Sequence, residues 1–132
     1  MAHKYNVLHL EDNPIYIEAF ENFIKSLNVN YEAVINVVAA FDRLEKQPPH
    51  LLIVDLMLED DSNPKPGIKF IEEVSAKYPN VRMMVLSAQD DPKYKKKLQD
   101  YVVHYENKSF RPSTLKEKMK TILEGSLEGN GA

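Results

Sequence analysis

Short apolar segments alternate with helix-like segments five times along this chain of 132 residues. The short segments are rich in Val, Ile and Leu and have the length of buried strands. They are residues 5–10, 33–35, 51–56, 81–87 and 102–105. Between them, apolar residues recur every three or four positions, as on one face of a helix. Near-continuous apolar strands joined by helices predict one domain, an α/β fold whose parallel sheet is covered on both faces.

Prolines mark the expected helix ends. The first helix starts at Asn13-Pro14 and carries apolar residues as far as Leu27. The other boundaries are Pro48-Pro49 and Pro79, which end the second and third helices, and Pro92 and Pro112, which begin the fourth and fifth. We expect one domain over residues 1–124. Residues 125–132 are small and polar, and are expected to form a flexible tail or to be a remnant of an added sequence.

Composition excludes several classes of protein. The absence of Cys excludes disulfides and thiolate metal sites, and the net charge of −3 gives no reason to expect nucleic acid or a membrane as a partner. No apolar run has the length of a signal peptide core or a membrane span, so a cytoplasmic location is the default expectation. The four His residues lack the spacing of zinc ligands. His9, inside the first strand, is predicted to be a core histidine with its hydrogen bonds satisfied.

Charged and polar residues stand at the carboxyl ends of the expected strands. Asp55 interrupts the apolar segment LLIVDLML, although burying an unpaired carboxylate costs several kcal/mol. Glu11 and Asp12 follow the first strand, Ser87 ends the fourth, and Lys108 follows the fifth. Open parallel sheets bind ligands beyond these strand ends, so we expect the five side chains to meet there.

Crowded carboxylates repel one another unless a cation joins them, and their oxygens suit Mg²⁺. A carboxylate beside such an ion can attack phosphorus and form an aspartyl phosphate. Lys108 and Ser87 would then bind the other phosphoryl oxygens. The strand ends therefore predict a Mg²⁺ site at which one of the carboxylates could carry a phosphoryl group.

The segments VLHLEDN, LLIVDLML, VLSA and NKSF, in this order, resemble the receiver domain of a two-component response regulator. The resemblance covers roughly residues 5–123 and includes Tyr105, three residues before Lys108. It implies a flavodoxin-like (βα)5 fold, a doubly wound five-stranded parallel sheet with five helices. It also implies a phosphorylation switch that receives its phosphoryl group from a sensor histidine kinase or a phosphotransfer protein. Such a domain is not a free-standing enzyme, since it catalyses only its own phosphorylation and dephosphorylation.

The resemblance implies a role for each site residue. Asp55 would be the phosphoacceptor and one of the Mg²⁺ ligands. Asp12 would bind Mg²⁺ directly and Glu11 mostly through water, with the backbone carbonyl of Met57 as a further ligand. Lys108 would contact both the Asp55 carboxylate and the phosphoryl group.

Two residues would transmit the signal. Ser87 would turn towards the phosphoryl group, and Tyr105 would change rotamer with it. The face made by the fourth helix, the fifth strand and the fifth helix would then present two shapes. Lysines at 93, 95, 96 and 97 make this face basic, so we expect an acidic partner surface, or a second copy of the chain in a homodimer, to bind one shape better.

Met57 and Gln89 would flank the path of the water that hydrolyses the aspartyl phosphate. Gln89 can orient that water by hydrogen bonding, whereas Met57 cannot. Gln89→Ala is therefore expected to slow dephosphorylation more than Met57→Ala.

The chain departs from the family pattern in three places, one of which is the Asp100-Tyr101 pair that replaces the usual Gly-Ala pair before the fifth strand. Ser109 stands where a proline usually follows the lysine, and a cis bond before Ser costs about 3–4 kcal/mol, so the bond is either strained or the loop is rebuilt. The loop after Asp55 is longer than usual and carries the acidic run at 59–61, while Gly67 takes the place of the glycine that opens the third helix.

Two other classes of function share part of this pattern. The alternative interpretation is a phosphorylation-independent, receiver-like interaction module. Such modules usually lack one of the acids or the lysine, and all of these residues are present here. A haloacid-dehalogenase-like phosphatase needs a second Asp two residues after the nucleophile, where Met57 stands. No DNA-binding or catalytic domain follows the fifth helix, so we expect a stand-alone receiver or one excised from a longer protein.

Overall fold

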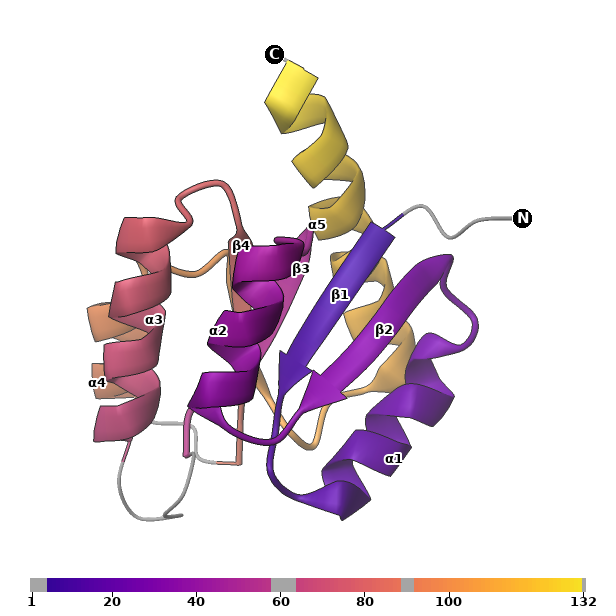
Figure 1. The fold of residues 1–132 in the computed structure, drawn as a ribbon. Coiled ribbons are helices and arrows are strands. Elements are labelled where there is room, and N and C mark those ends of the chain that lie inside the picture. The colour runs from indigo at the N-terminus through magenta and orange to yellow at the C-terminus, as the bar shows by residue number, and fades with distance from the viewer. Residues whose placement is uncertain (1–4, 58–63, 89–91, 132) are drawn as a thin grey trace.

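Five parallel strands form one sheet and alternate with five helices (Figure 1). The computed structural model describes residues 5–57, 64–88 and 92–131, with side chains described as far as residue 125. The strands are β1 (Tyr5–Leu10), β2 (Val29–Val34), β3 (Leu51–Asp55), β4 (Arg82–Ser87) and β5 (His104–Asn107). The helices are α1 (Pro14–Ile24), α2 (Val37–Lys46), α3 (Lys65–Lys77), α4 (Pro92–Leu98) and α5 (Pro112–Gly131). The strand order β2-β1-β3-β4-β5 confirms the predicted doubly wound, flavodoxin-like fold.

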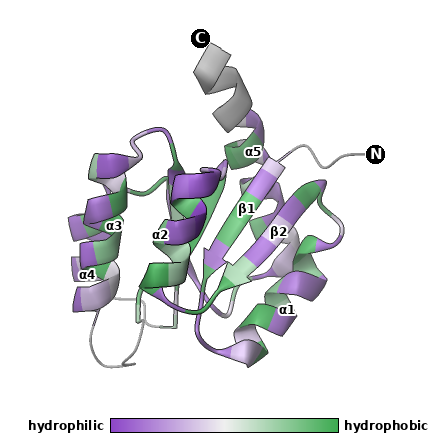
Figure 2. Cartoon of the chain, in the orientation of Figure 1, coloured by the Kyte–Doolittle hydropathy of each residue, from purple (hydrophilic) through white to green (hydrophobic). Residues whose placement is uncertain are grey.

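Helices cover both faces of the sheet, because successive side chains along a strand point to opposite faces. On one face, α1 and α5 contribute Phe20 and Leu115 to an apolar core. On the other face, α2, α3 and α4 contribute Leu44, Ile71 and Leu98 to a second core. The central strand β3 is buried along its whole length and contributes side chains to both cores. In Figure 2 hydrophobic (green) segments of β1 and β2 are interrupted by hydrophilic (purple) ones.

The strands at the two edges of the sheet lie elsewhere than predicted. The second strand was expected at 33–35 and runs over Val29–Val34, and the fifth was expected at 102–105 and runs over His104–Asn107. Each edge strand pairs with one neighbour only. Alternate residues of β2 face solvent, and every residue of β5 is half-buried. Polar residues therefore interrupt the apolar pattern by which interior strands are recognised.

Two helix ends also differ from the expectation. The first helix ends at Ile24, and Leu27 lies in the following turn, where its amide donates to the Ile24 carbonyl at 2.9 Å. The last helix continues to Gly131. The division of the chain at residue 124 stays a prediction.

The order of the strands brings the ends of β1 and β3 together. β2 pairs with one side of β1, and β3 pairs with the other side. The direction in which successive strands are added to the sheet therefore reverses at β1. Leu10 pairs with Val54, the residues just before Glu11 and Asp55. Ligand sites of open α/β sheets lie at such reversals, beyond the carboxyl ends of the strands.

Gly67, in the first turn of α3, lies against the loop that follows Asp55. A Cβ atom at this position would lie 2.3 Å from the carbonyl oxygen of Leu56, which is backbone and has little room to move. The missing side chain therefore allows the helix to approach the backbone beside Asp55. This supports the sequence-based expectation that Gly67 opens the third helix.

Gly67→Ala is expected to lower the free energy of unfolding by about 1–3 kcal/mol, because the helix or the loop must shift to accept the methyl group. The matched control is Gly125→Ala in α5, where an added Cβ would meet nothing within 4 Å. Alanine also favours the helix there, so the control is expected to be neutral or stabilising by up to about 1 kcal/mol. Urea unfolding followed by circular dichroism measures both. Equal effects of the two substitutions would show that the close approach of α3 to Leu56 is not tight.

Candidate functional site

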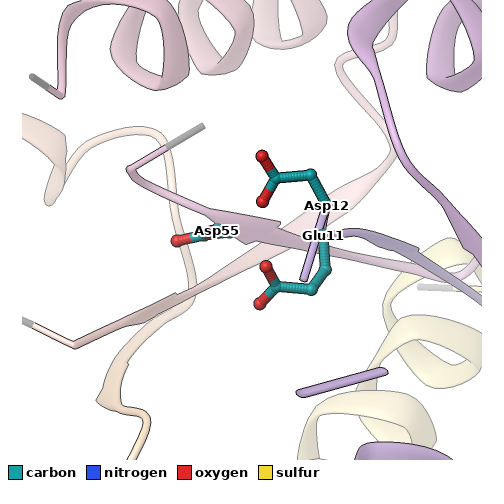
Figure 3. Close-up of side chains that lie close together, drawn as sticks. All are labelled: Glu11, Asp12 and Asp55. Carbon is teal, nitrogen blue, oxygen red and sulfur yellow. The ribbon is translucent and has the colours of Figure 1, made fainter. Parts of the chain in front are cut away.

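Three carboxyl groups lie together at the carboxyl edge of the sheet (Figure 3). Glu11 and Asp12 directly follow β1, and Asp55 is the last residue of β3. Each offers an oxygen that lies within 4.8 Å of an oxygen of the other two. Glu11 and Asp55 are buried, with relative exposures of 0% and 3%, whereas Asp12 is exposed. The sequence prediction that these acids meet is therefore correct.

The ammonium of Lys108 lies between the two buried carboxylates. Its Nζ is 2.7 Å from Oε1 of Glu11 and 3.3 Å from Oδ2 of Asp55. The backbone amide of Lys108 donates to the Ser87 carbonyl at 2.9 Å, which ties the lysine to the end of β4. Tyr16, in the first turn of α1, lies beneath the ammonium with its ring centre 3.9 Å from Nζ. Asp55 is thus tolerated in an apolar strand because a cation contacts it.

The electrostatics of the site follow from burial and from this shared cation. The pKa of Glu11 is raised to about 7: burial is the main cause, the contact with Lys108 opposes the rise, and the nearby charge of Asp55 adds to it. Burial by itself would lower the pKa of Lys108, but the contact with Glu11 and the charge of Asp55 outweigh it and raise that pKa. One ammonium faces two buried acids, so the site favours a further positive charge.

The loop that carries Lys108 is held by the side chain of Asn107. Its Oδ1 accepts hydrogen bonds from the backbone amide of Ser109 at 2.8 Å and from the Ser109 hydroxyl at 2.7 Å. A proline at this position would have neither donor. Ser109 therefore fixes the turn after β5 through its hydrogen bonds to the Asn107 side chain. The proline that usually follows the lysine in this family could not form these bonds.

Asp55 is also oriented from its own strand. Its Oδ1 accepts a hydrogen bond from the Met57 amide at 3.1 Å, while Oδ2 faces Lys108. The Met57 side chain is 6% exposed and packs in the core beneath α2 and α3. Gln89 and the acidic run at 59–61 lie outside the described residues. The expected roles of Met57 and Gln89 in hydrolysis stay predictions.

Ser87 and Tyr105 share the face of the sheet that α3 and α4 cover. Tyr105 pairs with Val85, and Ser87 lies two residues further along β4 on the same side. Ser87 is fully buried, and the half-buried Tyr105 packs against the core of that face. Lys95 of α4 lies 5.6 Å from the centre of the Tyr105 ring. The proposed switch residues are therefore neighbours, which is the placement that their predicted roles need.

His9 differs from its prediction as a satisfied core histidine. It is buried, and its Nδ1 is hydrogen-bonded to the Tyr31 hydroxyl at 2.7 Å. Its Nε2 is also buried but has no hydrogen-bond partner among the described residues. Burial, and to a lesser degree the charge of Lys108, lowers the pKa of His9 to about 3, so the ring is neutral.

The oxygens at this edge fit Mg²⁺. The ion prefers one or two carboxylates and keeps several of its waters. Asp12 is exposed and can bind a largely hydrated ion directly, whereas Glu11 is already engaged by Lys108. Direct binding by Asp12 and water-mediated binding by Glu11 stay predictions. The contact of Tyr16 with Lys108 was not predicted from the sequence. The position of Tyr16 in the first turn of the helix, four residues after Asp12, could have indicated that its ring lies near the site.

The sequence matches the family described as "Response regulator receiver domain" over residues 7–120. No curated protein sequence matches the chain. None of the helices in the described part of the chain is long and apolar enough to cross a membrane.

Solved structures share the fold at low sequence identity. The signal receiver domain of a putative Luxo repressor protein from Vibrio parahaemolyticus has a TM-score of 0.85 at 17% identity, covering 96% of this chain and 95% of that one. A response regulator from Thermotoga maritima has a TM-score of 0.81 at 23% identity, with coverage of 92% and 98%. NtrX from Brucella abortus has a TM-score of 0.82 at 14% identity, covering 99% of this chain. This chain spans 28% of the length of NtrX.

Mg²⁺ affinity is expected to fall roughly tenfold from about pH 8 to about pH 6. Glu11, with its pKa raised to about 7, is charged above that pH and gains a proton below it, so the site loses negative charge as the pH falls. Isothermal titration calorimetry measures the affinity. In Glu11→Gln the affinity is expected to be low and nearly independent of pH. The control, Glu32→Gln on the exposed edge strand β2, should behave as the wild type. An unchanged pH dependence in Glu11→Gln would contradict the prediction.

Proposed function

The chain belongs to the response regulator receiver domain family, and on that premise we propose that it is a switch controlled by Mg²⁺-dependent phosphorylation of Asp55. The observation that carries the proposal is the ammonium of Lys108, which contacts both buried carboxylates of the acidic cluster. A sensor histidine kinase or a phosphotransfer protein supplies the phosphoryl group, in a phosphorelay in the cytoplasm. The protein is not an enzyme acting on other substrates, because the group it transfers ends on its own side chain.

The proposed step is a displacement at phosphorus. A carboxylate oxygen of Asp55 donates a lone pair to the phosphorus of a phosphohistidine and forms a P–O bond. The P–N bond breaks, and its electron pair stays on the imidazole nitrogen of the donor. Lys108 is placed to neutralise charge on the phosphoryl oxygens, because its Nζ already lies 3.3 Å from Asp55. Later attack by water on phosphorus returns the Asp55 carboxylate and inorganic phosphate.

Asp12, Asp55 and the backbone carbonyl of Met57 would hold the ion, with Glu11 acting through water. When bound, Mg²⁺ supplies positive charge to the phosphoryl oxygens. Two contacts within the chain already orient the carboxylates that would meet the ion. The Met57 amide orients the Asp55 carboxylate, and Lys108 screens Glu11 from it.

Acetyl phosphate with Mg²⁺ is expected to add one phosphoryl group to the wild type and none to Asp55→Asn, because the amide is not a nucleophile. Lys108→Ala is expected to be phosphorylated on the order of a hundredfold more slowly, since one donor to the developing charge is lost. Lys46→Ala is the matched control, because Lys46 pairs with Asp42 on the exposed face of α2. Intact-mass spectrometry over time measures all four.

An equal adduct on the wild type and on Asp55→Asn would show that Asp55 is not the acceptor. A folded wild type that binds Mg²⁺ but takes up no phosphoryl group, from acetyl phosphate or from a phosphorylated histidine domain, would favour the phosphorylation-independent interaction module instead.

The signal is proposed to leave through Ser87 and Tyr105. A phosphoryl group on Asp55 adds charge and acceptor oxygens, and the Ser87 hydroxyl gains a hydrogen bond by turning towards them. Movement of Ser87 makes room beneath α4, into which the Tyr105 ring turns. The face formed by α4, β5 and α5 then has two shapes, of which an acidic partner or a second copy of the chain binds one. Its lysines at 93, 95, 96 and 97 are exposed on α4.

Beryllofluoride with Mg²⁺ is expected to change the NMR chemical shifts at Tyr105 and along α4, as well as in the loops around Asp55. In Ser87→Ala the changes at Tyr105 and α4 should be reduced at least about threefold, because no hydroxyl turns towards the acceptor. Ser75→Ala on α3 is the matched control. Changes confined to the loops around Asp55 in the wild type would refute this route.

A further inference from the structure

The ammonium of Lys108 has three close neighbours. Its Nζ is 2.7 Å from Oε1 of Glu11 and 3.3 Å from Oδ2 of Asp55, so the two acids can accept two of its three hydrogens. The ring of Tyr16 lies over the same nitrogen, with 3.9 Å between Nζ and the ring centre. The Lys108 side chain is only 9% exposed. A cation this close to the face of an aromatic ring is attracted by the negative charge of that face.

The turn that carries Tyr16 also holds Glu11. Asn13 caps the start of α1, where its Oδ1 accepts a hydrogen bond from the Ile15 amide at 2.9 Å. The Asn13 amide donates to Oε2 of Glu11 at 3.2 Å. The turn therefore contacts one oxygen of this carboxylate, and Lys108 contacts the other. Tyr16 lies three residues after the cap, so the start of α1 places a carboxylate and a ring against one ammonium (Figure 1).

Packing in the core does not account for an aromatic residue at position 16. Tyr16 is 38% exposed, and among the described residues it belongs to neither apolar core. A lysine side chain is flexible and loses much rotamer freedom when it is held in one place. The Lys108 ammonium is closer to Glu11 than to Asp55, so its contact with the proposed phosphoacceptor is the longer of the two. A third contact restricts the ammonium to the position in which it reaches both acids.

We propose that Tyr16 is a positioning residue for phosphorylation of Asp55, and that the face of its ring holds the Lys108 ammonium where it reaches the phosphoryl oxygens. The role in phosphorylation rests on the proposed function, whereas the hold on Lys108 is a property of the resting protein. Tyr16 acts through Lys108 and takes no part in the bonds that form or break. The face of the ring carries the effect, so phenylalanine can replace tyrosine here and leucine cannot.

The first test observes Lys108 without a phosphoryl donor and without Mg²⁺. Protons over the face of an aromatic ring resonate upfield, so we expect an upfield shift of the Lys108 CεH2 protons, next to the nitrogen that the ring faces. NMR of the full chain with ¹³C-labelled lysine measures this shift, and Lys108→Ala identifies the signal. Tyr16→Phe should keep the upfield shift, and Tyr16→Leu should lose it. The control is Tyr101→Leu, which removes a tyrosine that is 37% exposed, and it should keep the shift.

The second test measures the rate of phosphorylation by acetyl phosphate with Mg²⁺, using intact-mass spectrometry over time. A carboxylate oxygen of Asp55 forms a P–O bond, the P–O bond to the acetyl group breaks, and acetate leaves with its electron pair. Tyr16→Phe is expected to react within about twofold of the wild-type rate, and Tyr16→Leu about threefold to tenfold more slowly, because one cation–π contact is lost. Tyr101→Leu should react as the wild type does.

A double-mutant cycle separates positioning of Lys108 from a general effect on the fold. If the ring acts through the ammonium, Tyr16→Leu has no further effect on the rate once Lys108→Ala has removed that ammonium. Leucine is a good helix former, and position 16 is partly exposed, so Tyr16→Leu is expected to fold as the wild type does. Circular dichroism checks this.

Three results would overturn the role of Tyr16 alone. They are an upfield shift that persists in Tyr16→Leu, a wild-type rate in Tyr16→Leu, and a slowing of the same size in the Lys108→Ala background. A different result would overturn the proposed function, and with it any role of Tyr16 in phosphorylation. That result is a wild type that keeps the upfield shift but takes up no phosphoryl group, from acetyl phosphate or from a phosphorylated histidine domain.

Discussion

Two buried carboxylates that share one ammonium are the constraint around which this molecule is arranged. Glu11 and Asp55 have almost no exposure to solvent, and Lys108 is the cation that contacts them both. Ionised groups in such surroundings are costly unless paired. With one positive charge against two buried negative ones and Asp12 nearby, the site keeps an excess of negative charge. This excess explains why a divalent cation suits this edge of the sheet.

The rest of the fold serves to bring these charges together and to connect them with the opposite face. The reversal of winding between β1 and β3 places the acids side by side, and the Lys108 amide binds the carbonyl of Ser87 at the end of β4. Ser87 and Tyr105 lie on the face covered by α3 and α4, whereas Phe20 and Leu115 lie on the face covered by α1 and α5. The carboxyl edge of the sheet therefore borders both cores.

The sequence was sufficient where burial is complete and insufficient where it is partial. The apolar run around Asp55 predicted the central strand, and the acids after β1 were recognised because they follow a buried strand. The edge strand that begins at Val29 was misplaced because its residues alternate between core and solvent. The unused nitrogen of His9 was not foreseen, because hydrogen bonding depends on which residue lies across the sheet, here Tyr31. Likewise, the Asn107–Ser109 turn follows from side-chain geometry that no spacing reveals.

The stacking of Lys108 on Tyr16 gives the molecule an optical property. The chain has seven tyrosines and no tryptophan, so tyrosine emission is not masked by energy transfer to an indole. The ring centre of Tyr16 lies 3.9 Å from the ammonium nitrogen of Lys108. Displacement of that ammonium changes the electric field on the phenol ring. Movement of Lys108 is therefore expected to alter the contribution of Tyr16 to the absorbance and fluorescence that the seven tyrosines share.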